Sequence, residues 1–203
     1  MTKKVVLVAL LAVGSFGLRA QQLSATDKAD LNSTIAQFMK HTESMNFEGI
    51  VDMTYPKVFD LVTKQQMLSL LNGLSGMGFE VSYDSITNQE PILVAKNDSV
   101  KYALVNYYSE MVMKITKEEM KTKESIDILK LSLLNTAGVE SIDYVEETSS
   151  LIVKGNKRLL AIKDQAYGDQ WSAIEFDVNN PALNAMLVPT PILTEISEFI
   201  KKN

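Results

Sequence analysis

The residues of this sequence that could take part in acid–base chemistry are few and scattered. His41 is the only histidine, and the ordinary pKa of imidazole would let it act as a general base near neutral pH. Asp52 and Asp60 flank the pair Tyr55-Pro56, so a buried carboxylate beside the tyrosine hydroxyl could serve an isomerase-like pocket. Each acidic or basic group also fits a plainer role, as an exposed helix position or a turn residue. The sequence therefore assigns no residue to catalysis.

A second group of residues is suited to binding a ligand. Aromatic and methionine side chains line adaptable pockets for apolar molecules. The pattern of the chain places five such residues toward one interior: Tyr55, Tyr83, Tyr107, Met111 and Trp171. The same residues would also suit an ordinary packed core. Both interpretations predict that these side chains lie inside the protein.

Other kinds of site lack the residues they need. There is no cysteine, which excludes disulfides, thiolate nucleophiles and cysteine-ligated zinc. A single histidine is poor support for a transition-metal site, so we predict neither a metal nor a cofactor. Gly73, Gly76 and Gly78 follow a predicted helix and precede a predicted strand, the reverse of a dinucleotide-binding loop. No serine-centred nucleophile elbow is present.

The first 20 residues have the pattern of a secretory signal peptide. Lys3 and Lys4 precede an apolar run from Val5 to Val13, and small residues then lead to Ala20. We expect export with cleavage near Ala20, which leaves a single domain over residues 21–203. The alternative is a membrane anchor, but the apolar run is too short to span a bilayer. The mature chain is therefore predicted to have no transmembrane span.

The charge of the mature chain limits its partners. Cleavage would remove Lys3, Lys4 and Arg19 and no acidic residue, so the net charge would change from −5 to −8. This charge disfavours nucleic acid, because affinity for it comes largely from lysine and arginine contacts with phosphates. The expected partners are a small apolar ligand or another protein of the cell envelope. The sequence leaves open the oligomeric state and the choice between periplasm and exterior.

Apolar periodicity and capping residues predict several helices. The first spans about 26–45, and a short second one begins at Phe47 and ends before Pro56, which cannot donate a helical hydrogen bond. Thr63 and Gln66 have the spacing of a capping box and open a third helix. Further helices are predicted over 116–137, after Asn180 and after Thr190.

From Phe79 the apolar period changes to two, which indicates strands. Val100 to Ile115 is the longest alternating run, and Glu110 and Glu175 are expected to face solvent on their strands. Gly155-Asn156 is expected to be a hairpin turn. The predicted strands are 79–83, 91–96, 100–115, 142–146, 151–154, 157–163 and 171–178, with a short extended segment at 57–62.

The order of these elements resembles the NTF2-like, cystatin-like cone superfamily, and is most similar to exported bacterial members of poorly characterised type. The matching segments are 30–45, Ile50 to Pro56, 100–115 and Trp171 to Glu175. The resemblance implies an α+β fold in which N-terminal helices pack on a strongly curved, mainly antiparallel sheet. It would carry a helical insertion near 116–137 and C-terminal helices.

The same resemblance implies a pocket between sheet and helices, which some members use for small apolar ligands or for isomerase or dehydratase chemistry. It transfers no catalytic residue, since the chain has no His–Asp pair of the dehydratase kind. We therefore expect an exported, non-catalytic binding or accessory domain that holds a small apolar ligand. The alternative is a structural or protein-interaction module that uses the 116–137 helix as its contact, and an enzyme is a third, weaker possibility.

Overall fold

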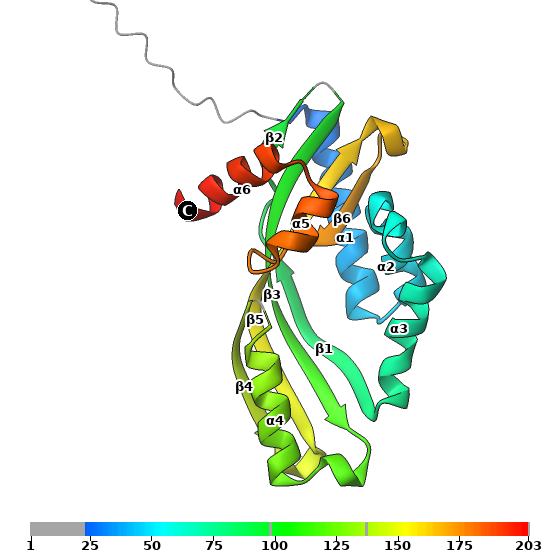
Figure 1. Ribbon diagram of the computed structural model, residues 1–203, viewed down its shortest axis with the longest axis vertical. Helices are drawn as coiled ribbons and strands as arrows, with labels where there is room; N and C mark the ends of the chain where they lie inside the picture. Colours follow the sequence, from blue (N-terminus) through cyan, green and yellow to red (C-terminus); the bar gives the residue numbers. More distant parts are fainter. Residues whose placement is uncertain (1–22, 98, 137, 203) are drawn as a thin grey trace, which may run out of the picture.

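The computed structural model describes residues 23–97, 99–136 and 138–202, so the predicted signal peptide lies outside the described residues. Within these residues the chain is an α+β fold with an open, six-stranded sheet (Figure 1). None of the described helices is both long enough and apolar enough to cross a membrane. The helices are α1 (Ala25–Glu43), α2 (Phe47–Met53), α3 (Lys64–Gly76), α4 (Lys123–Leu134), α5 (Pro181–Leu187) and α6 (Thr190–Lys202).

Two long strands form the centre of the sheet. β3 (Val100–Ile115) pairs with β5 (Ser150–Asp164) in one unbroken antiparallel register, from Val100 opposite Asp164 to Lys114 opposite Ser150. Two shorter strands share the outer edge of each long one. On β3 these are β2 (Ile92–Lys96) and β1 (Phe79–Asn88), and on β5 they are β6 (Trp171–Glu175) and β4 (Val139–Val145).

The sheet therefore has an upper half with β2 and β6 at its edges and a lower half with β1 and β4 (Figure 1). Because the β3–β5 register never shifts, odd-numbered residues of both strands share one face throughout. On this odd face, α1 covers the upper half through Leu31 and Ile35, and α4 covers part of the lower half through Ile126. The even face of the upper half packs against α5 and α6, where Leu187 and Ile196 are buried.

The Tyr-Pro segment that follows α2 lies against the sheet. Thr54 forms an isolated parallel bridge with Ala173 of β6, and the Tyr55 amide donates to the Ala173 carbonyl at 3.1 Å. The extended segment predicted after it is wrong, because Pro56 opens a 3₁₀-helix, η1 (Pro56–Asp60). Proline suits such a first position, since its missing N–H would have no intrahelical partner there.

The capping residues are confirmed at α3 and corrected at α4. At α3, the backbone N–H of Gln66 donates to Thr63 Oγ1 at 3.2 Å. In return, the backbone N–H of Thr63 donates to the side-chain oxygen Oε1 of Gln66 at 3.0 Å. The 116–137 segment instead contains a 3₁₀ turn, η2 (Glu118–Met120), and then α4, whose cap is Thr122. Thr116 does not cap this helix; its backbone amide donates to the Gly78 carbonyl at 2.9 Å and continues the strand pairing.

The predicted turn at Gly155-Asn156 is wrong, because β5 runs straight through both residues. Gly155 lies opposite Ser109 of β3 on one side, and the first residues of β4 approach it on the other. A Cβ atom at Gly155 would lie 1.8 Å from the carbonyl oxygen of Gly138. Glycine is therefore needed here for the close approach of two backbones rather than for a turn.

This contact predicts a large effect of Gly155→Ala. The methyl group would have to displace the Gly138 carbonyl, and we expect a loss of about 1–3 kcal/mol in the free energy of unfolding. Gly76→Ala is the matched control, because no atom lies within 4 Å of the added Cβ. Urea denaturation of both variants measures the difference. Equal stabilities would show that β4 does not hold the position described.

Candidate functional site

The structure brings three of the five predicted ligand-lining residues close together. Tyr83 of β1 lies opposite Met111 of β3, and Tyr107 lies four residues before Met111 on the same odd face. Trp171 is on this face too, but in the upper half under α1. Tyr55 belongs to the cluster on the even face, and its hydroxyl donates to Asp164 Oδ2 at 2.8 Å. The predicted set is thus divided between the two faces of the sheet.

Tyr83 and Met111 form part of an apolar area that we call the methionine face: Phe79, Val81, Tyr83, Met111 and Met113. All five side chains are half-buried, because α4 packs beside this area on the β4 side of the sheet. The neighbouring helix α3 is also loosely packed. Its apolar residues Met67, Leu68 and Leu71 are half-buried, and none of its described side chains is fully buried. The methionine face and α3 therefore retain apolar surface that the fold itself does not cover.

A polar group lies at the upper end of the methionine face. The Glu175 carboxylate lies close to the Tyr107 side chain, and Lys157 Nζ lies 3.4 Å from Glu175 Oε1. Burial, followed by the nearby Glu175 charge, raises the pKa of both Tyr107 and Tyr83. Both phenols therefore stay neutral at physiological pH and can donate hydrogen bonds.

The position of Glu175 differs from the sequence expectation in one respect. Its side chain is 56% exposed, as expected for a residue facing solvent. However, Glu175 pairs with Leu159 and so lies on the odd face, beside Tyr107 rather than away from it. Glu110 lies on the even face, where it forms an ion pair with Lys154 at 3.4 Å.

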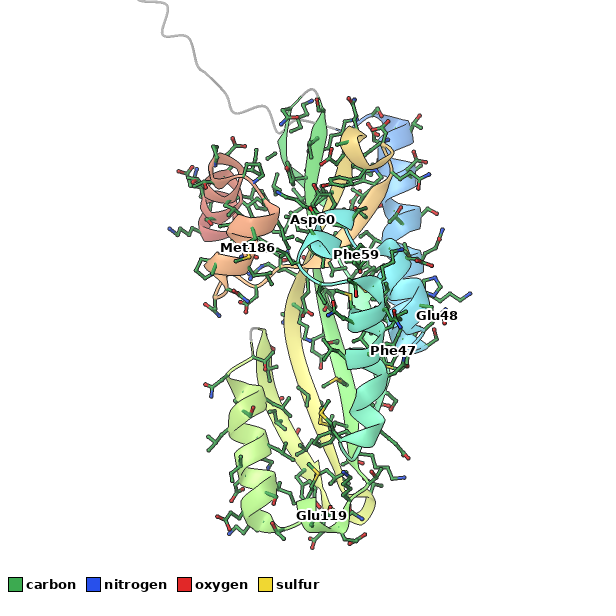
Figure 2. The ribbon with its side chains drawn as sticks, turned by 45° about the vertical axis from the view of Figure 1, so that its right-hand side comes forward. Phe47, Glu48, Phe59, Asp60, Glu119 and Met186 are labelled. Carbon is green, nitrogen blue, oxygen red and sulfur yellow. The ribbon has the colours of Figure 1, made fainter. Side chains whose placement is uncertain are left out.

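The acid–base candidates from the sequence do not come together around Tyr55. His41 packs over Gly49 where α1 meets α2, and its Nδ1 atom is 3.0 Å from Asn46 Nδ2. Asp52 is exposed and forms an ion pair with Lys64 at 2.7 Å, and Asp60 is exposed on η1 (Figure 2). The described residues contain no group of three acidic or histidine side chains that could hold a metal ion.

The carboxylate that does lie beside Tyr55 is Asp164, and both of its oxygens have structural partners. One accepts the Tyr55 hydroxyl, and the other accepts the Ala166 amide at 2.9 Å, which caps the 3₁₀ turn η4 (Gln165–Tyr167). Tyr167 then packs edge-to-face on the Tyr55 ring, with centroids 5.4 Å apart. This arrangement joins the end of β5 to the Tyr-Pro segment and offers no free general base.

A groove, which we call the α1–β6 groove, lies between α1, the end of α2 and the segment 163–172. Its volume is about 520 Å³, and its lining is mainly carboxylates, hydroxyls and amides. Trp171 lies in the lining and is only 7% exposed, yet its indole Nε1 has no hydrogen-bond partner among the described residues. The sequence predicted that Trp171 lines a pocket. It gave no indication that the polar residues of this groove would lie beside it.

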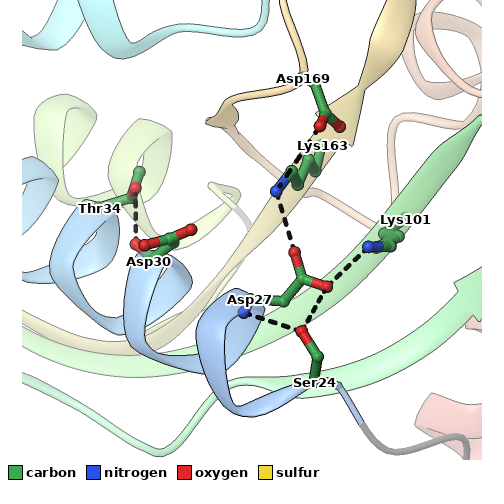
Figure 3. A network of polar contacts seen from close by, with 7 residues as sticks. All are labelled: Ser24, Asp27, Asp30, Thr34, Lys101, Lys163 and Asp169. Atoms are coloured by element: carbon green, nitrogen blue, oxygen red, sulfur yellow. Dashed lines mark hydrogen bonds and ion pairs between the residues drawn. The ribbon is translucent and has the colours of Figure 1, made fainter.

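Asp27 anchors α1 at the edge of this groove (Figure 3). Its carboxylate accepts hydrogen bonds from Lys101 at 2.7 Å and from Lys163 at 2.9 Å, and from the Ser24 hydroxyl at 2.9 Å. The bonds from the two lysines hold the pKa of Asp27 well below its ordinary value, and the bond to Asp27 raises the pKa of Lys163. These contacts could not be foreseen from the sequence, because the lysine partners of Asp27 are far away in the chain.

The Asp27 contacts predict a pH-dependent loss of stability in Asp27→Asn. At pH 7 we expect the free energy of unfolding to fall by about 3 kcal/mol, because the largely buried Lys163 loses its closest counter-charge. The folded pKa of Asp27 is depressed, so its stabilisation is present above the unfolded pKa of about 4 and is lost as the pH falls below it. The difference between wild type and variant should therefore shrink below about pH 4.

Chemical denaturation at several pH values measures this difference. Asp30→Asn is the control on the same helix, because the Asp30 carboxylate has no ion pair among the described residues. Its expected effect is below about 1 kcal/mol. An Asp27→Asn variant as stable as Asp30→Asn at pH 7 would contradict the anchoring role.

Comparison with known proteins adds no functional assignment to this geometry. No protein-family model matches the chain, and no curated protein matches it. The functional inference for this chain therefore rests on the methionine face, the α1–β6 groove and the charges around them.

Proposed function

We propose that this protein is a non-catalytic binding domain that holds a small apolar ligand against the methionine face. The observation that carries the proposal is the half-burial of Phe79, Tyr83, Met111 and Met113 on a part of the sheet that α4 covers only at its side. Apolar side chains left partly in water are stabilised when a ligand covers them. Methionine also adapts its shape to different apolar surfaces.

The polar group above this face suggests how such a ligand would be oriented. Tyr83 and Tyr107 are neutral donors, and Lys157 and Glu175 form an ion pair close by. An amphipathic molecule would place its apolar part on the methionines and its polar head against the phenols. Small-molecule sites typically combine an apolar lining with a small number of polar groups that orient the ligand.

The cone fold and export belong to the same proposal. Helix α1 on the odd face of an open antiparallel sheet is compatible with an NTF2-like arrangement, in which ligands lie between sheet and helices. Export is supported by the charged and apolar pattern of residues 1–20. A cell-envelope location would bring the domain close to amphipathic molecules of the membrane.

Binding of the neutral fluorescent probe N-phenyl-1-naphthylamine tests the methionine face. We expect saturable binding to wild type and at least roughly tenfold weaker binding to Met111→Lys, since an ammonium group in the site would lose its hydration without a counter-charge. Fluorescence titration of the folded proteins measures the affinities. Thermal melts identify any general loss of structure.

The matched control for Met111→Lys is Met186→Lys. Met186 is a 56% exposed methionine on α5, away from the methionine face (Figure 2). The Met186→Lys variant should bind the probe as tightly as wild type. Loss of binding in both variants, or in neither, would count against the proposed site.

A second candidate function is self-association through α4. Three large apolar side chains on its outer side are strongly exposed: Ile128 at 61%, Leu131 at 64% and Leu134 at 47%. Acidic Glu124 and Asp127 precede Lys130 along the same helix, so an antiparallel helix pair would bring opposite charges together. A second copy of this chain therefore fits the surface in both polarity and charge.

Sedimentation equilibrium tests this second candidate. We expect a concentration-dependent dimer for wild type and a monomer for the double variant Ile128→Lys, Leu131→Lys, because the two ammonium groups would repel across the pair. Leu70→Lys, on a 66% exposed residue of α3, is the control and should still associate. A wild-type monomer at all concentrations reached would remove this candidate.

A further inference from the structure

The α1–β6 groove is separate from the methionine face and has a different chemistry. Three segments far apart in sequence build it: α1, the end of α2 up to Pro56, and the turn that leads from β5 into β6. Its volume of about 520 Å³ is within the range of small-molecule sites. Asp27 fixes the position of α1 relative to Lys163, so the walls of the groove are held by ion pairs (Figure 3).

Hydrogen-bond acceptors and donors face this groove together. The carboxylate of Asp30 makes no ion pair among the described residues, and that of Asp169 lies 4.0 Å from Lys163. Donors come from the side-chain amides of Gln37 and Gln170, which are both exposed. Trp171 also lies in the lining, but its indole Nε1 is buried within the protein rather than open to the groove. A matching ligand must therefore both accept and donate hydrogen bonds.

Several classes of ligand fail this requirement. A phosphate or carboxylate would meet Asp30, Asp52 and Asp169, while the lysine in the lining is already bonded to Asp27 at 2.9 Å. An apolar molecule would remove water from these polar groups without replacing its hydrogen bonds. An organic ammonium ion would suit the carboxylates but offers no acceptor to the side-chain amides of Gln37 and Gln170.

A hydroxyl group is both donor and acceptor, so a molecule with several hydroxyls satisfies the whole set. Tyr167 adds an aromatic surface beside them, 41% exposed and held in place by its edge-to-face contact with Tyr55. Such a ring can cover the apolar C–H face of a sugar. We infer that the α1–β6 groove is a binding site for a neutral saccharide, bound through the Asp30 carboxylate, the Gln170 amide and the ring of Tyr167.

Trp171 makes the inference directly measurable, because it is the only tryptophan in the chain. The full-length mature protein is first applied to a glycan array, and the glycan that binds best is then titrated while tryptophan fluorescence is recorded. We expect a saturable change in fluorescence. Asp30→Asn and Gln170→Ala should each weaken binding roughly tenfold, since each removes hydrogen bonds to the ligand.

Two controls make the outcome decisive. Asp143→Asn, an exposed residue of β4 in the lower half, carries the same charge change outside the groove and should leave the affinity unchanged. Spermidine, titrated in the same way, separates a cation site from a saccharide site. The inference would be overturned by an array without binding above background, by a response to spermidine alone, or by Asp30→Asn and Gln170→Ala that bind as wild type does.

Discussion

The continuous pairing of β3 with β5 is the constraint on which the rest of this structure depends. Because its register never shifts, every odd-numbered residue from Val100 to Ile115 lies on the same face as the odd-numbered residues of β5. A slip of one residue would move all of them to the opposite face. The two long strands thus decide which side chains meet α1 and α4 and which meet α5 and α6. Gly155 allows this ladder to continue where β4 begins.

The helices cover the upper and lower halves of the sheet unequally. The proposed binding surface is a consequence of this difference. In the upper half, α1 packs on the odd face and α5 and α6 pack on the even face. In the lower half, α4 packs on the odd face, while the even face carries ion pairs such as Glu110 with Lys154. The loosely packed α3 completes the cover only in part. Apolar surface therefore remains in partial contact with water at the methionine face.

The upper half is held together by polar contacts between distant segments. Asp27 joins α1 to both central strands, and Asp164 joins the end of β5 to Tyr55. Buried charges of this kind are stable only when their partners are present, so they fix the position of α1 rather than merely adding stability. The α1–β6 groove lies between these two anchors. Its polar lining contrasts with the apolar methionine face, and the two surfaces suit ligands of different classes.

Much of the local structure was predictable from the sequence, because its causes are local. The Thr63–Gln66 capping box, the Pro181 helix start and the alternation of Val100 to Ile115 depend on neighbours within a few residues. The errors arose where contacts between distant segments prevailed. Thr116 has a cap-like spacing but bonds to Gly78, and Gly155 resembles a turn residue but lies inside a strand.

The sequence by itself determined most of the helices and strands, the absence of cysteine chemistry and the apolar character of Tyr83, Tyr107 and Met111. Only the tertiary structure decided that these three share a face, that Tyr55 lies on the other one, and that Trp171 belongs to a polar groove. The physical reason is that periodicity records which side of its own strand a residue occupies. Which helix covers that side depends on strand register and on ion pairs between residues such as Asp27 and Lys163, which are far apart in the chain.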